Sequence, residues 1–187
     1  MKRIIILMSL LFGLIQTAGA AEFKPYLGGG IGLASLSLEV TGASAGSGSG
    51  STLGGYGSIG FDYGDYAGAE LRVGTTGKAS VTIGGVNYDF SSDWFVSYLA
   101  KLQFPVTEKF RIYALAGATT TKQTMMITTP GWFWTATGTA KLSQTTTKAS
   151  LGTGIDFQAG EQWDVGLEFM SYGAGLVTGA FNLNYSF

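Results

Sequence analysis

The chain has 187 residues, 11 Lys plus Arg against 12 Asp plus Glu, and a formal net charge of −1, and it contains no His and no Cys. This balance provides no basic surface for nucleic acid, and the missing residue types exclude disulfides, zinc sites built from His or Cys, and His-dependent nucleophilic catalysis. We therefore expect no enzyme, no cofactor and no metal. The 30 Gly, three Pro and 13% aromatic residues favour many strands over helices, because Gly is costly inside a helix.

The N-terminus has the pattern of a secretory signal. Lys2 and Arg3 precede an apolar run and the cleavage-type sequence Ala18-Gly19-Ala20, as in signal peptides. The run is shorter than the about 20 apolar residues that a membrane-spanning helix needs. We expect residues 1–20 to be a cleaved signal peptide and residues 21–187 to form a single domain. No later segment resembles a membrane helix, so a place in the membrane would require a closed barrel.

The first half of this domain alternates between apolar and polar residues, as strands do. In the first expected strand the apolar parity switches between Leu33 and Leu36, which suggests a bulge or the point of emergence from a membrane. Residues 41–52 are rich in Gly and Ser, so we expect a mobile first loop there. After a second strand and a tight turn, the third strand places Glu70 and Arg72 on the face opposite its apolar residues.

The middle of the chain predicts two further loops. Residues 75–92 read as a second loop that contains an extended hairpin, and the fourth strand that follows points Lys101 inward. Residues 119–147 are rich in Thr and predict the longest loop, which is centred on Trp132, Phe133 and Trp134. Three consecutive aromatic residues are either an exposed patch that meets a partner or side chains that pack on neighbouring loops or lipid.

The C-terminal part predicts three more strands. Asp156 and Glu168 lie on the inner faces of the sixth and seventh strands, and the last strand carries its apolar residues on one face and Asn or Ser on the other. Short turns alternate with long loops along the chain, which is the up-and-down pattern of outer-membrane barrels. The predicted fold is therefore all-β, an eight-stranded antiparallel up-and-down transmembrane β-barrel.

The charged residues on the inner faces form a candidate site. Side chains fill the interior of an eight-stranded barrel, and buried charges require partners. We therefore predict a polar network in the lumen, which is either a plug that fixes the fold or a gate for ions. Its predicted members are Glu70, Arg72, Lys101, Asp156 and Glu168.

Four segments, together with the strand pattern around them, resemble the small outer-membrane barrels of the OmpA transmembrane type over the whole domain. The segments are residues 60–70, 100–107, 154–157 and 166–169. The resemblance implies an integral protein of the outer membrane of a Gram-negative bacterium, without the periplasmic peptidoglycan-binding domain that many members append.

The resemblance also implies roles for single residues. Glu70 and Lys101 match one of the family's lumen ion pairs, whereas Gly166 stands where the family has the Arg partner of the acid at Asp156. Phe181, Tyr185 and Phe187 resemble the C-terminal aromatic signal that the outer-membrane assembly machinery recognises.

These observations favour a structural or surface-interaction role through the loops. The implied partners are outer-membrane lipid, lipopolysaccharide, the assembly machinery, and a surface ligand or host receptor, with the protein itself a monomer. Three alternatives remain open: an adhesin that uses the loop aromatics, a narrow pore gated by the lumen ion pairs, and a secreted soluble barrel of the lipocalin kind. In the last, the bulky faces of strands two, four and eight would line a ligand cavity.

Overall fold

The computed structural model describes residues 23–40, 46–83, 86–129, 138–173 and 175–187. Within these ranges no helix is long and apolar enough to cross a membrane. The described chain is built from β-strands, which are β1 (Phe23–Val40), β2 (Gly46–Tyr63), β3 (Ala67–Thr76), β4 (Lys78–Ile83), β5 (Val86–Pro105), β6 (Phe110–Thr129), β7 (Gly138–Gln158), β8 (Trp163–Ser171) and β9 (Leu176–Ser186).

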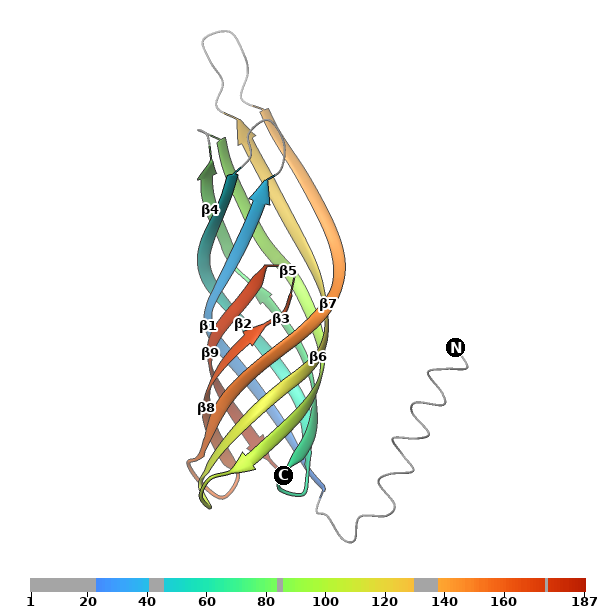
Figure 1. Ribbon diagram of the computed structural model, residues 1–187, viewed down its shortest axis with the longest axis vertical. Coiled ribbons are helices and arrows are strands. Elements are labelled where there is room, and N and C mark those ends of the chain that lie inside the picture. The colour runs from blue at the N-terminus through green and yellow to red at the C-terminus, as the bar shows by residue number, and fades with distance from the viewer. Residues whose placement is uncertain (1–22, 41–45, 84–85, 130–137, 174) are drawn as a thin grey trace, which may run out of the picture.

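The strands form one closed antiparallel ring (Figure 1). Strands that follow each other in sequence pair with each other, except β3 and β4. β9 pairs with β1, and β3 pairs with β5, which closes the sheet. β3 and β4 are consecutive pieces that both pair with β5, so together they occupy one place in a ring of eight strands. This confirms the predicted eight-stranded up-and-down barrel.

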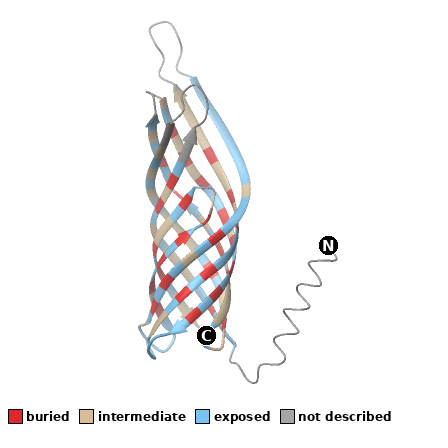
Figure 2. Cartoon of the chain, viewed as in Figure 1, coloured by how far each residue is buried: buried red, intermediate tan, exposed pale blue. Residues whose placement is uncertain are grey.

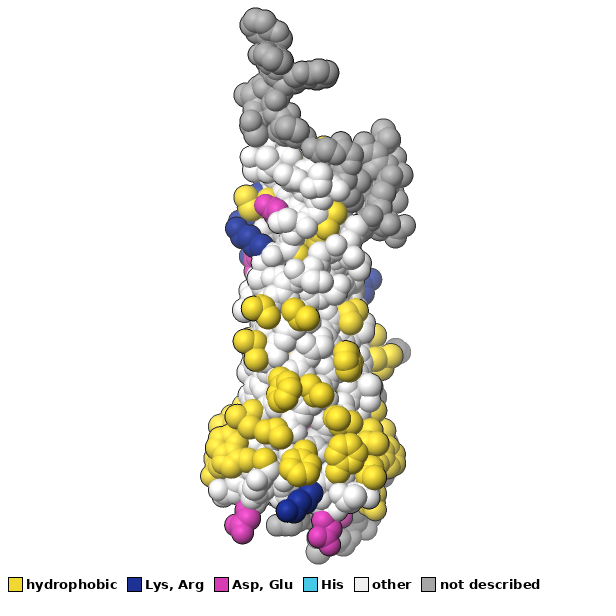
Figure 3. Space-filling view, turned by 90° about the vertical axis from the view of Figure 1, so that its left-hand side faces the viewer, with side chains coloured by type: hydrophobic (Ala, Val, Ile, Leu, Met, Phe, Trp, Pro, Cys, Tyr) yellow, Lys and Arg dark blue, Asp and Glu magenta, His cyan; other side chains and the backbone are white. Residues whose placement is uncertain are grey.

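In the lower barrel most outward side chains are apolar, and the charged side chains of the strands point inward. On β5, Tyr98 and Leu102 are exposed, whereas Ser97, Leu99 and Lys101 on the other face are buried. Figure 2 shows the same alternation of buried and exposed residues along the lower strands, and Figure 3 shows apolar side chains spread over the lower part of one face. The soluble alternative is therefore wrong, because the bulky faces that it requires inside the barrel lie outside.

The two ends of the barrel differ. The turns after β2, β5 and β7 are short and lie at the end that carries the C-terminus, whereas β5, β6 and β7 extend far toward the other end (Figure 1). In outer-membrane barrels the short turns are periplasmic and the longer connections are extracellular. The upper end in Figure 1 is accordingly the extracellular end.

Two of the expected loops are largely strand. β2 begins at Gly46, inside the expected first loop, and β6 and β7 continue to Thr129 and from Gly138 through most of the expected third loop. The expectation failed because a lipid-spanning strand uses only about ten residues, and these strands continue beyond that span. Thr is a good strand residue, and the hydroxyls of Thr120 and Thr147 lie 2.9 Å apart across the pair. The expected hairpin in residues 75–92 is present as β4 and the start of β5, with Val81 opposite Tyr88.

The parity switch in β1 does not mark a bulge. The pairing of β1 with β2 runs without a break from Phe23 opposite Tyr63 to Val40 opposite Gly46. Leu36 instead points into the upper barrel, where it is 3% exposed and belongs to a cluster with Tyr88 and Phe90. The inner surface thus changes from charged in the lower barrel to an apolar cluster among uncharged Ser and Thr above it.

The hairpin of β8 and β9 is short. β8 pairs with β7 only from Ser171 opposite Leu151 downward, and β9 reaches β1 only up to Leu176 opposite Leu36. Gly173 and Gly175 have φ of 69° and 77°, a conformation that Gly adopts without steric cost. The barrel wall is consequently lower at this hairpin than on the side of β5, β6 and β7.

The outward apolar face predicts a specific effect of charge. Ile31 is 65% exposed and lies between Gly55 on β2 and Phe181 on β9. We expect Ile31→Arg to lower the free energy of unfolding in phospholipid vesicles by about 2–4 kcal/mol, because the guanidinium would face lipid. Thr145→Arg, on the exposed upper part of β7, should change it by no more than about 0.5 kcal/mol. The free energies come from unfolding in guanidinium chloride, followed by Trp fluorescence. Equal losses for the two variants would contradict the assignment of the outer face around Ile31 to the lipid.

Candidate functional site in the barrel lumen

Arg72 on β3 links two carboxylates across the lumen. Its Nε lies 2.6 Å from Oε1 of Glu70, two residues earlier on the same inner face. Its Nη1 and Nη2 lie 2.5 and 2.7 Å from the two carboxylate oxygens of Glu168 on β8. Arg72 and Glu168 are each 1% exposed. The planar guanidinium thus makes the two-pronged contact that Arg forms best with a carboxylate.

Tyrosine side chains contact the three charged residues Glu70, Arg72 and Glu168, which we call the Arg72 group. The hydroxyl of Tyr26 donates to Glu70 at 3.0 Å, and that of Tyr113 donates to Glu168 at 3.0 Å. Asn182 in turn donates to the Tyr113 hydroxyl at 2.8 Å. The Arg72 guanidinium lies 4.4 Å from the centre of the Tyr56 ring. These contacts compensate the cost of burying three charges, which would be high for unpaired groups.

A second group of charges lies nearer the periplasmic end. Lys101 Nζ is 3.5 Å from Asp62 and 3.8 Å from Asp156, and Arg111 is 2.6 Å from Asp164 and 3.8 Å from Asp62. Most of these distances are longer than those around Arg72, so this group is held more loosely. It borders a depression of about 340 Å³ at the mouth of the barrel, which Asp62, Arg111 and Asp164 help to line.

The five predicted lumen residues are all buried, but they pair differently from the expectation. Glu70 and Lys101 do not form an ion pair with each other. Arg72 pairs with Glu70, which lies on the same inner face of β3, and Lys101 pairs with Asp62 and Asp156 instead. The sequence predicts that Arg72 lies in the lumen. Only the closed ring shows that its side chain reaches across the lumen from β3 to Glu168 on β8.

The neighbours of Gly166 leave no room for the Arg that the resembled family has at this position. A Cβ added to Gly166 would lie 2.3 Å from both Oδ1 of Asp156 and Oδ1 of Asn182. A larger side chain at this position would therefore displace both groups. Lys101, reaching in from β5, provides the cation for Asp156 instead.

Sequence reasoning missed three charged members of the network: Asp62, Arg111 and Asp164. Arg111 shares the parity of the buried Tyr113, and Asp164 shares that of the buried Glu168, but parity does not identify their partners. Asp62 has the parity of the buried Ser58, and this is the signal that identifies it as a lumen residue. The tyrosine donors carry no comparable sequence signal, because their partners lie 44 and 55 residues away.

The remaining predicted residues belong to the aromatic triplet and to the C-terminal segment. Trp132, Phe133 and Trp134 fall outside the described residues. Phe181 and Phe187 are 61% and 67% exposed on the outer face. The Tyr185 ring contacts those of Trp163 and Phe187 at centroid distances of 4.8 and 5.2 Å. The assembly role of Phe181, Tyr185 and Phe187 stays a prediction.

The lumen is filled rather than hollow around the Arg72 group. Above it, a space of only about 10 Å³ lies among Tyr56, Phe95 and Tyr172, which is about the volume that one water requires. The described residues contain no group of three His, Cys, Asp or Glu arranged to hold a metal ion. The arrangement is a polar plug inside an apolar outer wall.

An apolar outer face, a closed ring and a charged, filled interior together define an integral outer-membrane β-barrel. Residues 4–187 match the family model of the outer membrane protein beta-barrel domain, and the chain belongs to this family. It is accordingly a protein of the outer membrane of a Gram-negative bacterium. A search of curated proteins finds no match.

Solved structures of small outer-membrane proteins share the fold. Ail, the attachment invasion locus protein of Yersinia pestis, is 18% identical with a TM-score of 0.52, over 88% of this chain and 99% of Ail. Neisserial surface protein A is 12% identical with a TM-score of 0.55, over 87% and 97% of the two chains. OprG from Pseudomonas aeruginosa is 13% identical with a TM-score of 0.52, over 88% and 96%.

The Arg72 group predicts a large stability effect. Arg72→Ala would leave Glu70 and Glu168 buried without a cation, so we expect the free energy of unfolding in vesicles to fall by about 3–5 kcal/mol. Arg111→Ala should cost less, because the Arg111 side chain is 27% exposed at the rim and water there can solvate Asp164. Guanidinium titrations of both variants measure the difference, and an equal loss would show that the Arg72 group does not hold the barrel together.

Proposed function

We propose that this protein is a closed outer-membrane barrel whose extracellular sheet binds a macromolecular partner at the cell surface. The observation that carries the proposal is the length of β5, β6 and β7, which continue as a paired sheet beyond the level of the β8–β9 hairpin. A barrel that served only as a membrane plug would need no such extension. The outward positions of upper β7 carry Thr, Lys, Ser and Ala rather than bulky apolar residues, which suits contact with the aqueous medium.

The lumen network supports a structural plug rather than a gate. Arg72 binds carboxylates from β3 and β8 at 2.5–2.7 Å, and moving it would leave buried charges without partners. A narrow pore is the less favoured role, since the packed tyrosines leave little space beside the ion pairs. The absence of His and Cys supports a non-enzymatic protein without a cofactor.

The membrane context completes the proposal. Residues 1–20 would direct export and be removed, and residues 21–187 would insert as a monomer among outer-membrane lipid and lipopolysaccharide. The assembly machinery would recognise Phe181, Tyr185 and Phe187, which are aromatic residues of the last strand. Trp132, Phe133 and Trp134 would lie between the ends of β6 and β7 in sequence and would add to the surface that meets a partner.

Planar-bilayer recordings test the closed lumen. We expect no conductance steps from the wild-type barrel or from Lys101→Ala, because the Arg72 group still fills the section above Lys101. Reproducible steps in the wild type that change in Arg72→Ala would contradict the plug and favour a pore. Heat-modifiable migration in detergent gels would verify that each inserted variant is folded.

Adhesion of cells that display the protein tests the surface role. Ail has been seen in complex with the heparin analogue sucrose octasulfate, so suitable surfaces are coated with heparin or with whole serum proteins. In the variant, an Asn-Gly turn replaces residues 121–146 and joins paired positions of β6 and β7. We expect wild-type adhesion to at least one surface and its loss in the variant. Adhesion that persists in a folded, displayed variant would overturn the proposal.

A further inference from the structure

The upper part of β7 has an open edge. Its residues 139–150 pair with β6 on one side, and pairing with β8 on the other side starts only at Leu151 opposite Ser171. In the described chain no strand pairs with that second side of residues 139–150. Figure 1 shows β7 rising above the short β8–β9 hairpin, and Figure 2 shows this stretch as exposed. Within the described residues, the barrel wall is therefore open between upper β1 and the part of β7 above Lys148 and Ala149, which Gly173 approaches.

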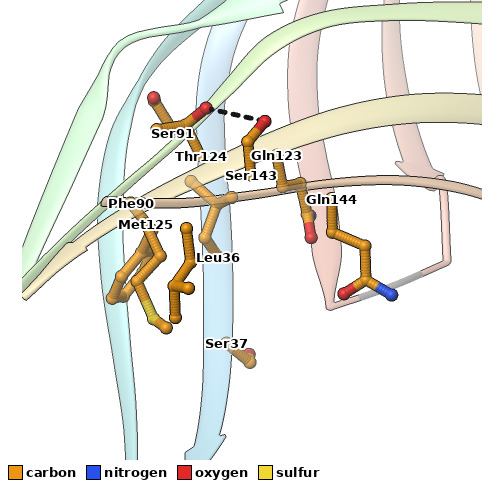
Figure 4. A pocket seen from close by; sticks show the side chains of 10 residues that line it. Leu36, Ser37, Phe90, Ser91, Gln123, Thr124, Met125, Ser143 and Gln144 are labelled. Atoms are coloured by element: carbon orange, nitrogen blue, oxygen red, sulfur yellow. Dashed lines mark hydrogen bonds between the residues drawn. The ribbon is translucent and has the colours of Figure 1, made fainter. Parts of the chain in front are cut away.

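An apolar pocket opens beside this edge. It has a volume of about 440 Å³, and Leu142 of β7 forms one of its apolar walls. The other apolar walls come from Leu36 of β1, Phe90 of β5 and Met125 of β6 (Figure 4). Leu36 and Phe90 are 3% and 7% exposed, but Leu142 is 55% exposed. The pocket thus combines a buried apolar floor with an apolar side chain on the open strand itself.

The position and charge of the edge identify the kind of occupant. The outward residues of this stretch are Thr, Lys, Ser and Ala, in contrast to the exposed Leu151 and Phe169 below, so the edge lies above the lipid and acyl chains do not reach it. An open strand edge offers backbone N–H and C=O groups that only another polypeptide strand satisfies in full. Lys141 and Lys148 lie on the stretch, and residues 138–150 contain no acid.

A second copy of this chain is a poor occupant. Two barrels inserted in the same direction hold their β7 strands parallel, and parallel pairs are slightly less stable per residue than antiparallel ones. Pairing in register would also set Lys141 against Lys141 and Lys148 against Lys148. Like charges directly opposite each other destabilise a strand pair. The lysines thus disfavour self-association and attract acidic segments.

We propose that residues 139–150 of β7 are a docking edge for an extended acidic peptide segment of another protein. The segment adds to the sheet as a further strand, and one of its apolar side chains enters the pocket formed by Leu36, Phe90, Met125 and Leu142. Main-chain hydrogen bonds then supply affinity, and the pocket and the lysines supply specificity. The inference rests on the proposed surface-interaction function and names its site and the chemistry of its partner.

A fluorescence anisotropy titration tests the docking edge on the full-length barrel in detergent. The probe is a short fluorescein-labelled peptide of alternating Val and Thr with Glu at both ends. We expect saturable binding by the wild type and no binding of the same peptide with alternate backbone nitrogens methylated, because that peptide lacks the donors for strand pairing. Equal binding of both peptides would overturn the proposal.

Two matched variants distinguish the contribution of the pocket to peptide binding from the effect of an added negative charge. Leu142→Asp should weaken peptide binding by about tenfold or more, in line with the loss of one buried apolar contact. Thr145→Asp places the same charge on the same open edge but on the opposite face of β7, so it should weaken binding less. Heat-modifiable migration would verify that both variants are folded. Equal effects of the two substitutions would refute the role of the pocket, and a peptide-independent dimer in sedimentation would show that a second copy is the occupant.

The outcomes distinguish this inference from the proposed function. If the peptide does not bind while adhesion still depends on residues 121–146, the surface role stands and the docking edge is wrong. If the wild type adheres but adhesion does not depend on those residues, the proposed function fails whatever the peptide does.

Discussion

The rest of this structure depends on one constraint, that every backbone N–H and C=O in lipid must be paired within the protein. The ring satisfies it by joining β3 to β5 and β1 to β9, so that no edge is open at the level of the apolar belt. Closure fixes the width of the barrel, and at eight strands the interior admits side chains but no wide channel. The interior around Arg72 is consequently packed, and the outer surface at that level is mostly apolar.

The packed interior explains why the charges are arranged as they are. Side chains that point inward from β3, β5 and β8 meet near the barrel axis, where a charge without a partner would be costly. Arg72 meets this requirement with two carboxylates and the tyrosines that bind them, at short distances. The group around Lys101 is nearer the periplasmic mouth and has longer ion-pair distances. In the second group only the contact between Arg111 and Asp164, at 2.6 Å, is as short as those around Arg72.

Above the belt the same constraint no longer applies, because water can bind the backbone. β7 can therefore run past the end of β8 with one open edge, and the inner face of the extension can carry the apolar cluster around Leu36 and Phe90. An open edge is a risk for association, and the lysines on upper β7 limit it. An open edge, which lipid would forbid, is thus possible above the membrane, and it is the edge that we propose as a docking site.

The sequence by itself determined the alternation along the strands, the order of strands, the membrane type of barrel and the inward direction of five charged residues, because a period of two is a local property. It did not identify Asp62 as a sixth. It misjudged where the strands end, since Thr-rich and Gly-rich stretches pair as well as apolar ones when water covers them. Only the tertiary structure decided that Arg72 binds Glu168, that Lys101 binds Asp156 rather than Glu70, and that upper β7 lacks a neighbour. Both ion pairs join strands across a closed ring, and the open edge depends on where β8 ends. Strand register and strand length decide these features, and neither can be read from a single stretch of sequence.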